Sequence, residues 1–201
     1  MEAGCGTGGN LAMLSRFGKL EAFELDDEAR AIAESKMPIN VKPGILPDGI
    51  PFKAGSFDVV TAFDVIEHVE KDVESLGKLA EQLAPGGRLF MTVPALPWLW
   101  SKHDETHHHF RRYTKASLNE TLRKAGLEPV RISYFNTFLF PLIAGLRLAR
   151  KALGITESAD DAMPGPAANS MLKAVFGAES SLVGRIPLPI GVSLMAVAKR
   201  A

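Results

Sequence analysis

The sequence is poor in cysteine and in long apolar runs, and its charges balance. Cys5 is the one cysteine among 201 residues, so no disulfide can form within the chain and a reducing cytosol is the expected location. Lys and Arg together number 23, and Asp and Glu together also number 23. The chain therefore has no net positive charge that would favour binding to nucleic acid. A membrane span needs about 18 uninterrupted apolar residues, and the most apolar window, 134–146, contains an asparagine and a proline. The first residues lack a basic region followed by an apolar stretch, so no signal peptide is expected there.

Strand-like and helix-like segments alternate along the chain. Apolar or β-branched runs predict strands at 20–25, from 41, 57–63, 88–93, 130–135 and 190–198. Helical periodicity predicts helices at 8–17, 27–36, 71–83, 114–125, 138–153 and 168–176, with Asp26 and Thr114 as N-caps. This order predicts one α/β domain over 1–201, a Rossmann-like doubly wound sheet with helices on both faces. In such sheets ligands bind beyond the carboxyl ends of the strands.

A glycine-rich loop precedes the first predicted helix. Gly4, Gly6 and Gly9 fit the spacing of a dinucleotide-binding loop, G-x-G-x-x-G. Gly4, Gly6 and Gly8, with Glu2 in front, fit a second spacing, E-x-G-x-G-x-G, as well. Eighteen residues after Gly6, Glu24 ends the second strand, where a carboxylate can accept hydrogen bonds from ribose hydroxyls. These residues predict a nucleoside-containing cofactor and leave its identity open.

Three downstream motifs narrow the choice. Residues 50–60 read IPFKAGSFDVV, residues 64–68 read DVIEH, and residues 83–89 read LAPGGRL. Together with the glycine loop, these motifs follow one another over residues 1 to about 94. In content and order they resemble the motifs of the class I S-adenosylmethionine-dependent methyltransferases. The resemblance implies a mostly parallel sheet with an antiparallel C-terminal strand, S-adenosyl-L-methionine as cofactor, a cofactor-binding half at 1–94 and an acceptor-side half at 95–201.

The resemblance also implies which residues contact the cofactor. They lie in the glycine loop and after the second, third and fourth strands: Glu2, Gly4, Cys5, Gly6, Gly8, Asn10, Glu24, Leu25, Ile45, Leu46, Phe63, Asp64 and Val65. Glu24 would hold the ribose, Leu25 would pack on the adenine, and Ile45 and Leu46 would border the adenine edge. Many relatives carry Asp at the position of Ile45, so backbone or water would have to bind the adenine amino group here.

The family's first strand normally supplies several apolar residues before the acidic position, whereas only Met1 precedes Glu2. We therefore expect a truncated first strand. A preceding segment is the favoured explanation, and a different segment filling the gap is the alternative.

Titratable residues after the fourth and fifth strands are the candidates for catalysis. A hydroxyl acceptor must lose a proton during methyl transfer, which favours a histidine base near the site. The candidate bases are His68, His107 and His108. Residues 94–113 read PALPWLWSKHDETHHHFRRY and predict an acceptor-binding loop, with Trp98, Trp100, His103, Arg111 and Arg112 as substrate contacts. The alternative is that these side chains anchor the loop. His103 and His107 have the spacing of a helical metal-binding pair, but methyl transfer needs no metal, so none is expected.

The pattern of the C-terminal third predicts helices over 136–178 that cover the acceptor side, with a polar linker at 154–166. Leucines alternate with basic residues along 138–153, which favours either packing on the sheet or peripheral contact with a membrane that carries a lipid-linked acceptor. The predicted function is methyl transfer to a small-molecule or lipid-linked acceptor, with oxygen as the favoured target atom. A non-catalytic binding protein of the same fold is the second hypothesis and a nicotinamide oxidoreductase the third. The sequence does not indicate an oligomeric state.

Overall fold

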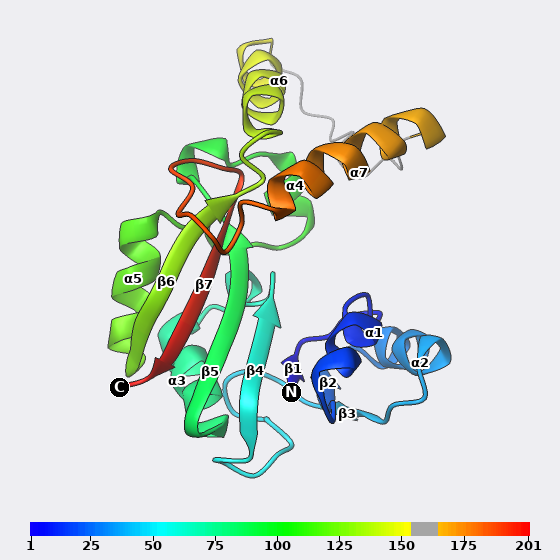
Figure 1. Ribbon diagram of the computed structural model, residues 1–201, viewed down its shortest axis with the longest axis vertical. Coiled ribbons are helices and arrows are strands. Elements are labelled where there is room, and N and C mark those ends of the chain that lie inside the picture. Colours follow the sequence, from blue (N-terminus) through cyan, green and yellow to red (C-terminus); the bar gives the residue numbers. More distant parts are fainter. Residues whose placement is uncertain (154–164) are drawn as a thin grey trace.

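A seven-stranded sheet forms the centre of the protein (Figure 1). The computed structural model describes residues 1–153 and 165–201. The strand order is β3-β2-β1-β4-β5-β7-β6, and β7 runs antiparallel to both of its neighbours. The strands are β1 Glu2–Ala3, β2 Ala22–Glu24, β3 Val41–Pro43, β4 Phe57–Phe63, β5 Leu83–Pro94, β6 Leu127–Phe135 and β7 Ser193–Arg200. This arrangement confirms the predicted mostly parallel sheet with an antiparallel C-terminal strand.

The first strand has two residues, in line with the truncated strand that the sequence predicts. It lies between β2 and β4. Its backbone pairs on both sides: Glu2 N donates to the carbonyl of Glu21 at 2.9 Å, and Thr61 N donates to the carbonyl of Met1 at 2.9 Å. Ala3 is fully buried. This short strand therefore places the glycine loop at the centre of the sheet, where the strand order reverses.

Most helices begin where the sequence predicts. The helices are α1 Leu11–Leu14, α2 Asp27–Lys36, α3 Asp72–Gln82, α4 Lys102–Thr106, α5 Lys115–Lys124, α6 Phe140–Ala152 and α7 Pro166–Ser180. Short 3-10 turns are η1 Ser15–Phe17, η2 Ile66–His68 and η3 Pro97–Leu99. Asp26 caps α2 by accepting from Ala29 N at 2.7 Å, and Thr114 caps α5 by accepting from Ser117 N at 3.0 Å.

Several boundaries differ from the prediction. The first helix begins at Leu11 rather than Gly8, because Gly8 has a φ of 79° that a right-handed helix excludes. Strand β5 begins at Leu83, so the Pro-Gly-Gly segment continues a strand instead of separating it from α3. The helix α4 and the turn η3 lie within the predicted acceptor loop and were not expected as elements.

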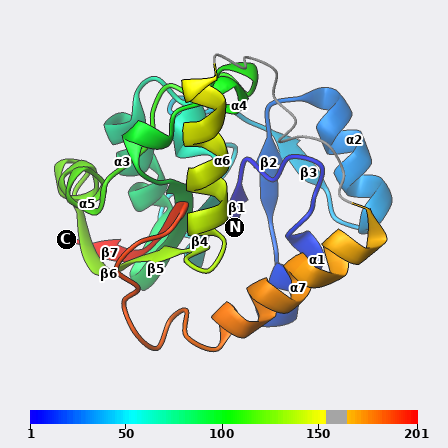
Figure 2. The same ribbon diagram turned by 90° about the horizontal axis from the view of Figure 1, so that it is seen from above.

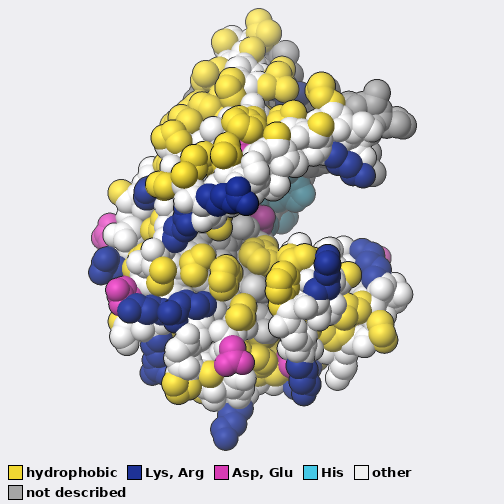
Figure 3. All heavy atoms as spheres, viewed as in Figure 1, with side chains coloured by type: hydrophobic (Ala, Val, Ile, Leu, Met, Phe, Trp, Pro, Cys, Tyr) yellow, Lys and Arg dark blue, Asp and Glu magenta, His cyan; other side chains and the backbone are white. Residues whose placement is uncertain are grey.

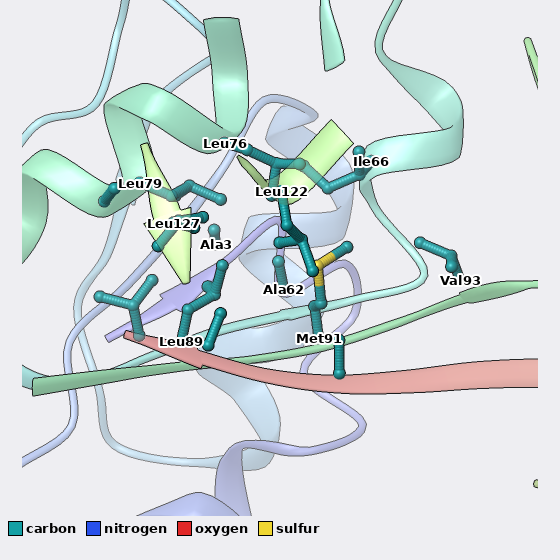
Figure 4. Close-up of a cluster of buried hydrophobic side chains, with 14 of the residues drawn as sticks. Ala3, Ala62, Ile66, Leu76, Leu79, Leu89, Met91, Val93, Leu122 and Leu127 are labelled. Carbon is teal, nitrogen blue, oxygen red and sulfur yellow. The ribbon is translucent and has the colours of Figure 1, made fainter. Parts of the chain in front are cut away.

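The main core lies between the sheet and the helices α3 and α5 (Figure 4). Leu76 and Leu79 on α3 and Leu122 on α5 are fully buried against Leu89 and Met91 of β5. The apolar residues of α3 and α5 recur at helical spacing, so each helix presents one apolar stripe to the sheet. This packing fixes the positions of β4 and β5, whose carboxyl ends carry the candidate catalytic residues.

The opposite face of β4–β7 has no helix over it in the part of the chain that the structure describes (Figure 1). A groove of about 740 Å³ opens there, bounded by Phe17, Val59 and Phe90 among others. Val59 is 43% exposed, so β4 is not buried on both faces. The predicted covering of both faces by helices therefore does not hold for the described residues at this end of the sheet.

Helices α6 and α7 stand over the carboxyl ends of the strands, as Figures 1 and 2 show together. They correspond to the predicted helical cover over 136–178. Most of the predicted linker, residues 154–164, lies outside the described residues. No described helix combines the length and apolarity needed to cross a membrane.

Candidate active site

The glycine loop takes a backbone conformation that other residues rarely adopt. Gly4, Gly6 and Gly8 have φ values of 62°, 52° and 79°. A Cβ atom on Gly4 would lie 2.9 Å from a methyl carbon of Val65, so this position has no room for a side chain. A Cβ atom on Gly6 would meet nothing within 4 Å. The backbone at Gly6 therefore faces open space in which a ligand can lie.

The carboxylate of Glu24 contacts this loop directly. Its Oε2 accepts from Gly6 N at 2.8 Å, and its Oε1 accepts from Leu25 N at 2.7 Å and Asp26 N at 3.1 Å. The sequence predicts that the glycine loop and Glu24 share one binding site, and in the structure they are in contact. Glu24 is only half-buried, so part of the carboxylate stays accessible beside the loop.

Glu2, Cys5 and Asn10 lie behind the loop. Glu2 is 1% exposed, and its Oε1 accepts from Asn10 Nδ2 at 3.1 Å. Its Oε2 has no partner among the described residues. Burial, only partly opposed by the bond from Asn10, raises the pKa of Glu2 to about 7. Burial also raises the pKa of the Cys5 thiol to about 12, so Cys5 is a structural residue of the loop rather than a nucleophile.

The other predicted cofactor contacts divide into two groups. Leu25 and Ile45 are 61% and 49% exposed at the ends of β2 and β3 and present apolar surface to a ligand. Leu46 is 9% exposed and belongs to the core, which leaves Ile45 as the accessible member of the predicted pair. Phe63 borders the groove on the uncovered face of the sheet.

At the end of β4 the chain turns sharply at Asp64, whose φ is 53°. Asp64 N donates to the carbonyl of Thr92 at 3.1 Å, which fixes this turn to β5. Loss of solvation raises the pKa of Asp64, partly opposed by Thr92. Val65 follows and packs against Gly4. The end of β4 therefore supports the glycine loop and borders the same site.

A deep cleft opens at the carboxyl edge of the sheet (Figure 3). It lies between the unit containing β1–β3, α1 and α2 and the part of the molecule that carries α6 and α7 (Figures 1 and 3). Histidine and acidic side chains are visible at its inner end. The cleft is thus distinct from the groove on the uncovered face, and it has titratable groups where strand ends meet.

Asp104 anchors the loop that forms one wall of this cleft. Its side chain is fully buried and accepts from Arg112 Nε at 2.7 Å, from Ser101 N at 2.9 Å and from His109 Nδ1 at 3.0 Å. Burial opposes ionisation of Asp104, but the bond and charge of Arg112, with help from Ser101 and His109, outweigh it and lower the pKa. Asp104 is therefore an ionised group that orients His109.

His109 lies against His68 from a different element. The two ring centroids are 4.6 Å apart in an edge-to-face arrangement. Glu67, beside His68 in η2, is 1% exposed, and its Oε2 has no partner among the described residues. Burial, followed by the nearby Asp64 carboxylate, raises the pKa of Glu67 to about 8. Burial also lowers the pKa of both histidines, so both favour the neutral imidazole.

The remaining residues predicted to contact the acceptor have varied surroundings. Arg111 donates to the carbonyls of Val69 and Glu70 and pairs with Asp72 at 3.1 Å. Arg112 is 7% exposed and also donates to the carbonyl of Ala95 at 3.0 Å. These contacts favour the loop-anchoring alternative for both arginines, because their guanidinium groups already bind the protein.

The aromatic residues of the loop are more accessible. Trp98 and Trp100 are 48% and 37% exposed, and Trp98 packs edge to face on Phe140 of α6. The ring of His103 lies 4.3 Å from that of His107, measured between centroids. His68, His107 and His108 are all exposed, and His68 lies at the end of η2 beside Glu67. Of the three predicted bases, only His68 is in the cluster with Glu67 and His109.

The predicted site residues do not include Glu67, Asp104 or His109. One local signal existed for Asp104: it is the third helical residue after Ser101, and the two form a capping box. Nothing in the spacing links Glu67 to His109, which lie 42 positions apart and meet only in the fold.

The fold and the site have the features of a methyltransferase, and comparison with known proteins agrees. A family model described as a methyltransferase domain matches residues 1–132. The chain belongs to this methyltransferase domain family.

Two curated relatives illustrate the similarity in sequence. The ubiquinone biosynthesis O-methyltransferase of Xanthomonas axonopodis is 28% identical over 147 residues, which cover 64% of this chain and 62% of that protein. A Mycolicibacterium smegmatis protein named as a probable S-adenosylmethionine-dependent methyltransferase is 27% identical over 132 residues, covering 64% of this chain and 51% of that protein. The chain thus spans less than two thirds of the length of these relatives.

Solved structures show the same fold. A methyltransferase from Bacillus halodurans superimposes with a TM-score of 0.65 at 17% identity and covers 98% of this chain and 90% of its own. Geranyl diphosphate C-methyltransferase from Streptomyces coelicolor, solved with S-adenosyl-L-homocysteine, has a TM-score of 0.66 at 15% identity, covering 100% of this chain and 70% of its own.

The anchoring role of Asp104 leads to a stability prediction. Replacing it in Asp104→Asn leaves the buried Arg112 without a compensating charge, so we expect a loss of about 3–5 kcal/mol in the free energy of unfolding. The matched control is Glu105→Gln, whose side chain is 51% exposed and should change stability by less than about 1 kcal/mol. Urea unfolding monitored by circular dichroism measures both. Equal stability of the two variants would contradict the anchoring role.

The raised pKa of Glu2 predicts how stability depends on pH. Between pH 4.5 and about 7 the folded protein holds a proton on Glu2 that the unfolded chain releases, so this group makes stability fall as pH rises through that window. Glu2→Gln has no charge to bury. It should match the wild type near pH 4 and exceed it by up to about 3 kcal/mol at pH 8. Urea unfolding across this range is the measurement, and a pH-independent difference would refute the assignment.

Proposed function

We propose that the protein binds S-adenosyl-L-methionine on the loop Gly4–Gly8 and transfers its methyl group to a small-molecule acceptor held in the cleft. The observation that carries this proposal is the 2.8 Å contact between Glu24 and Gly6 N beside a backbone that faces open space. A ribose can hydrogen-bond the accessible part of that carboxylate while the methionine portion lies on the bare backbone. Membership in the methyltransferase domain family supports the same cofactor.

The methyl group of the cofactor is reactive because it is attached to a sulfonium, so the protein has two tasks. It must align the acceptor lone pair behind the methyl carbon, and it must exclude water. The loop 94–113 and helices α6 and α7 stand over the carboxyl ends of the strands and supply an acceptor side for the cleft (Figure 2). Trp98 and Trp100 offer exposed flat surfaces for an acceptor to pack on.

Oxygen is the proposed target atom. The relative from Xanthomonas axonopodis is named as an O-methyltransferase, and histidines follow β4 and β5 at the inner end of the cleft. His68 is the residue of the three candidates that we place against the acceptor hydroxyl, because it lies at the end of η2 directly after β4. His107 and His108 are not part of the cluster of Glu67, His68 and His109 and have no part in this proposal.

A lipid-linked acceptor is the second candidate, favoured by one observation on α6. Leu142, Leu146 and Leu148 are about half exposed, at 55%, 49% and 52%, and no described element covers them. Arg147 holds this helix to the acceptor loop by donating to the carbonyl of Leu99 at 2.8 Å. An apolar helix face next to the cleft would let an acceptor with a hydrocarbon chain approach from a membrane surface.

Cofactor binding is tested first with a conservative variant of the ribose contact. Glu24→Gln keeps the shape of the side chain but removes the charge, and we expect the Kd for S-adenosyl-L-methionine to rise about tenfold, a change of about 1.4 kcal/mol. Glu28→Gln, on an exposed residue of α2, is the control and should leave the Kd unchanged. Isothermal titration calorimetry gives both values. Unaltered binding by Glu24→Gln, with the fold intact by circular dichroism, would remove the basis of the proposal.

Formation of S-adenosyl-L-homocysteine with hydroxyl-bearing acceptors would exclude a non-catalytic binding protein.

The lipid-linked candidate predicts membrane association through α6. The wild type should co-sediment with vesicles of phosphatidylcholine and phosphatidylglycerol, and the double variant Leu142→Glu, Leu146→Glu should lose most of that binding, because buried apolar area drives it. Phe17→Glu changes a side chain that is 83% exposed far from α6 and serves as the control. A protein that stays in the supernatant, or an equal loss in the control, rejects the lipid-linked acceptor and leaves methyl transfer itself untouched.

A further inference from the structure

Three potential metal ligands converge at the inner end of the acceptor loop. Glu67 and His68 come from η2 after β4, and His109 comes from the loop after α4. One ligand atom from each residue lies within 4.8 Å of the other two. Two imidazoles and one carboxylate at this separation form a common donor set for divalent transition metals.

The ring of His109 is already oriented by a buried carboxylate. His109 uses Nδ1 to contact the buried carboxylate of Asp104 at 3.0 Å, which leaves Nε2 to serve as a ligand. Metal-binding histidines in proteins almost always have such partners on the second nitrogen, because these bonds fix the ring and its tautomer.

The carboxylate of Glu67 gives an independent indication of a ligand. The residue is 1% exposed, and its Oε2 has no hydrogen-bond partner among the described residues. A buried polar atom without a partner costs free energy, and native structures rarely keep one without a reason. A cation would supply the missing interaction. His68 is exposed, so one side of the cluster stays open to the cleft.

We propose that Glu67, His68 and His109 bind one divalent cation of the zinc type, with an open coordination position toward the cleft. This set differs from the His103 and His107 pair that the sequence suggested. Binding of the ion does not depend on methyl transfer. Its use rests on the proposed function. With the ion bound, His68 would act through the ion as a ligand rather than directly as a base, and the ion would orient an acceptor hydroxyl in the open position and lower its pKa.

The test is calorimetric titration of the full chain, freed of metal by chelation, with zinc chloride. We expect one ion per chain for the wild type. Glu67→Gln and His109→Gln should each weaken binding by about tenfold or more. Glu67→Gln keeps the shape of the side chain and introduces no charge into the buried position, so it preserves the fold. The matched control His108→Asn changes an exposed histidine at a φ of 55°, a conformation that Asn tolerates, and should bind as the wild type does.

Two results would overturn the proposal. The first is no detectable zinc binding by the wild type. The second is binding that survives Glu67→Gln and His109→Gln but is lost in His103→Gln, which would place the ion on the helical pair. Titration of the same metal-free samples with S-adenosyl-L-methionine separates the two proposals. If the cofactor binds and zinc does not, only the cation site is rejected.

Discussion

The buried ion pair between Asp104 and Arg112 is the interaction on which the acceptor side of the cleft depends. Taking both charges out of water costs free energy that only close, well-directed contacts can offset. The 2.7 Å bond between them, together with the bonds from Ser101 and His109, supplies such contacts. Arg112 also donates to the carbonyl of Ala95, so the pair joins the loop to the end of β5. The orientation of His109 follows from this arrangement.

The two sides of the cleft are built by different means. The cofactor side depends on backbone conformation, because Gly4, Gly6 and Gly8 hold positive φ values and Glu24 binds the backbone of the same loop. The acceptor side depends on side chains that contact one another across η2 and the loop 94–113. Both sides lie at the carboxyl edge of a parallel sheet, where the strand order reverses between β1 and β4. A cofactor and an acceptor bound as proposed would therefore meet at this edge without any change in the sheet.

The sheet is packed unevenly on its two faces. Helices α3 and α5 cover one face with fully buried leucines, whereas the other face of β4 and β5 exposes Val59 and Phe90 beside a groove of about 740 Å³. The ends of β4 and β5 are held by packing on α3 and α5 and by pairing with the neighbouring strands. This groove and the candidate active site are therefore separate features.

The sequence by itself determined the alternation of strands and helices, the caps at Asp26 and Thr114, and the glycine loop with its carboxylate partner. These features arise from interactions between near neighbours or from regular spacing, which is why they are visible in one dimension. Tertiary structure decided which side chains the site can use. Leu46 joined the core, Arg111 and Arg112 bound the protein itself, and Glu67 met His109 across 42 positions. No periodicity encodes such contacts, because they depend on how the turn after β4 and the loop after β5 pack against each other once the sheet has formed.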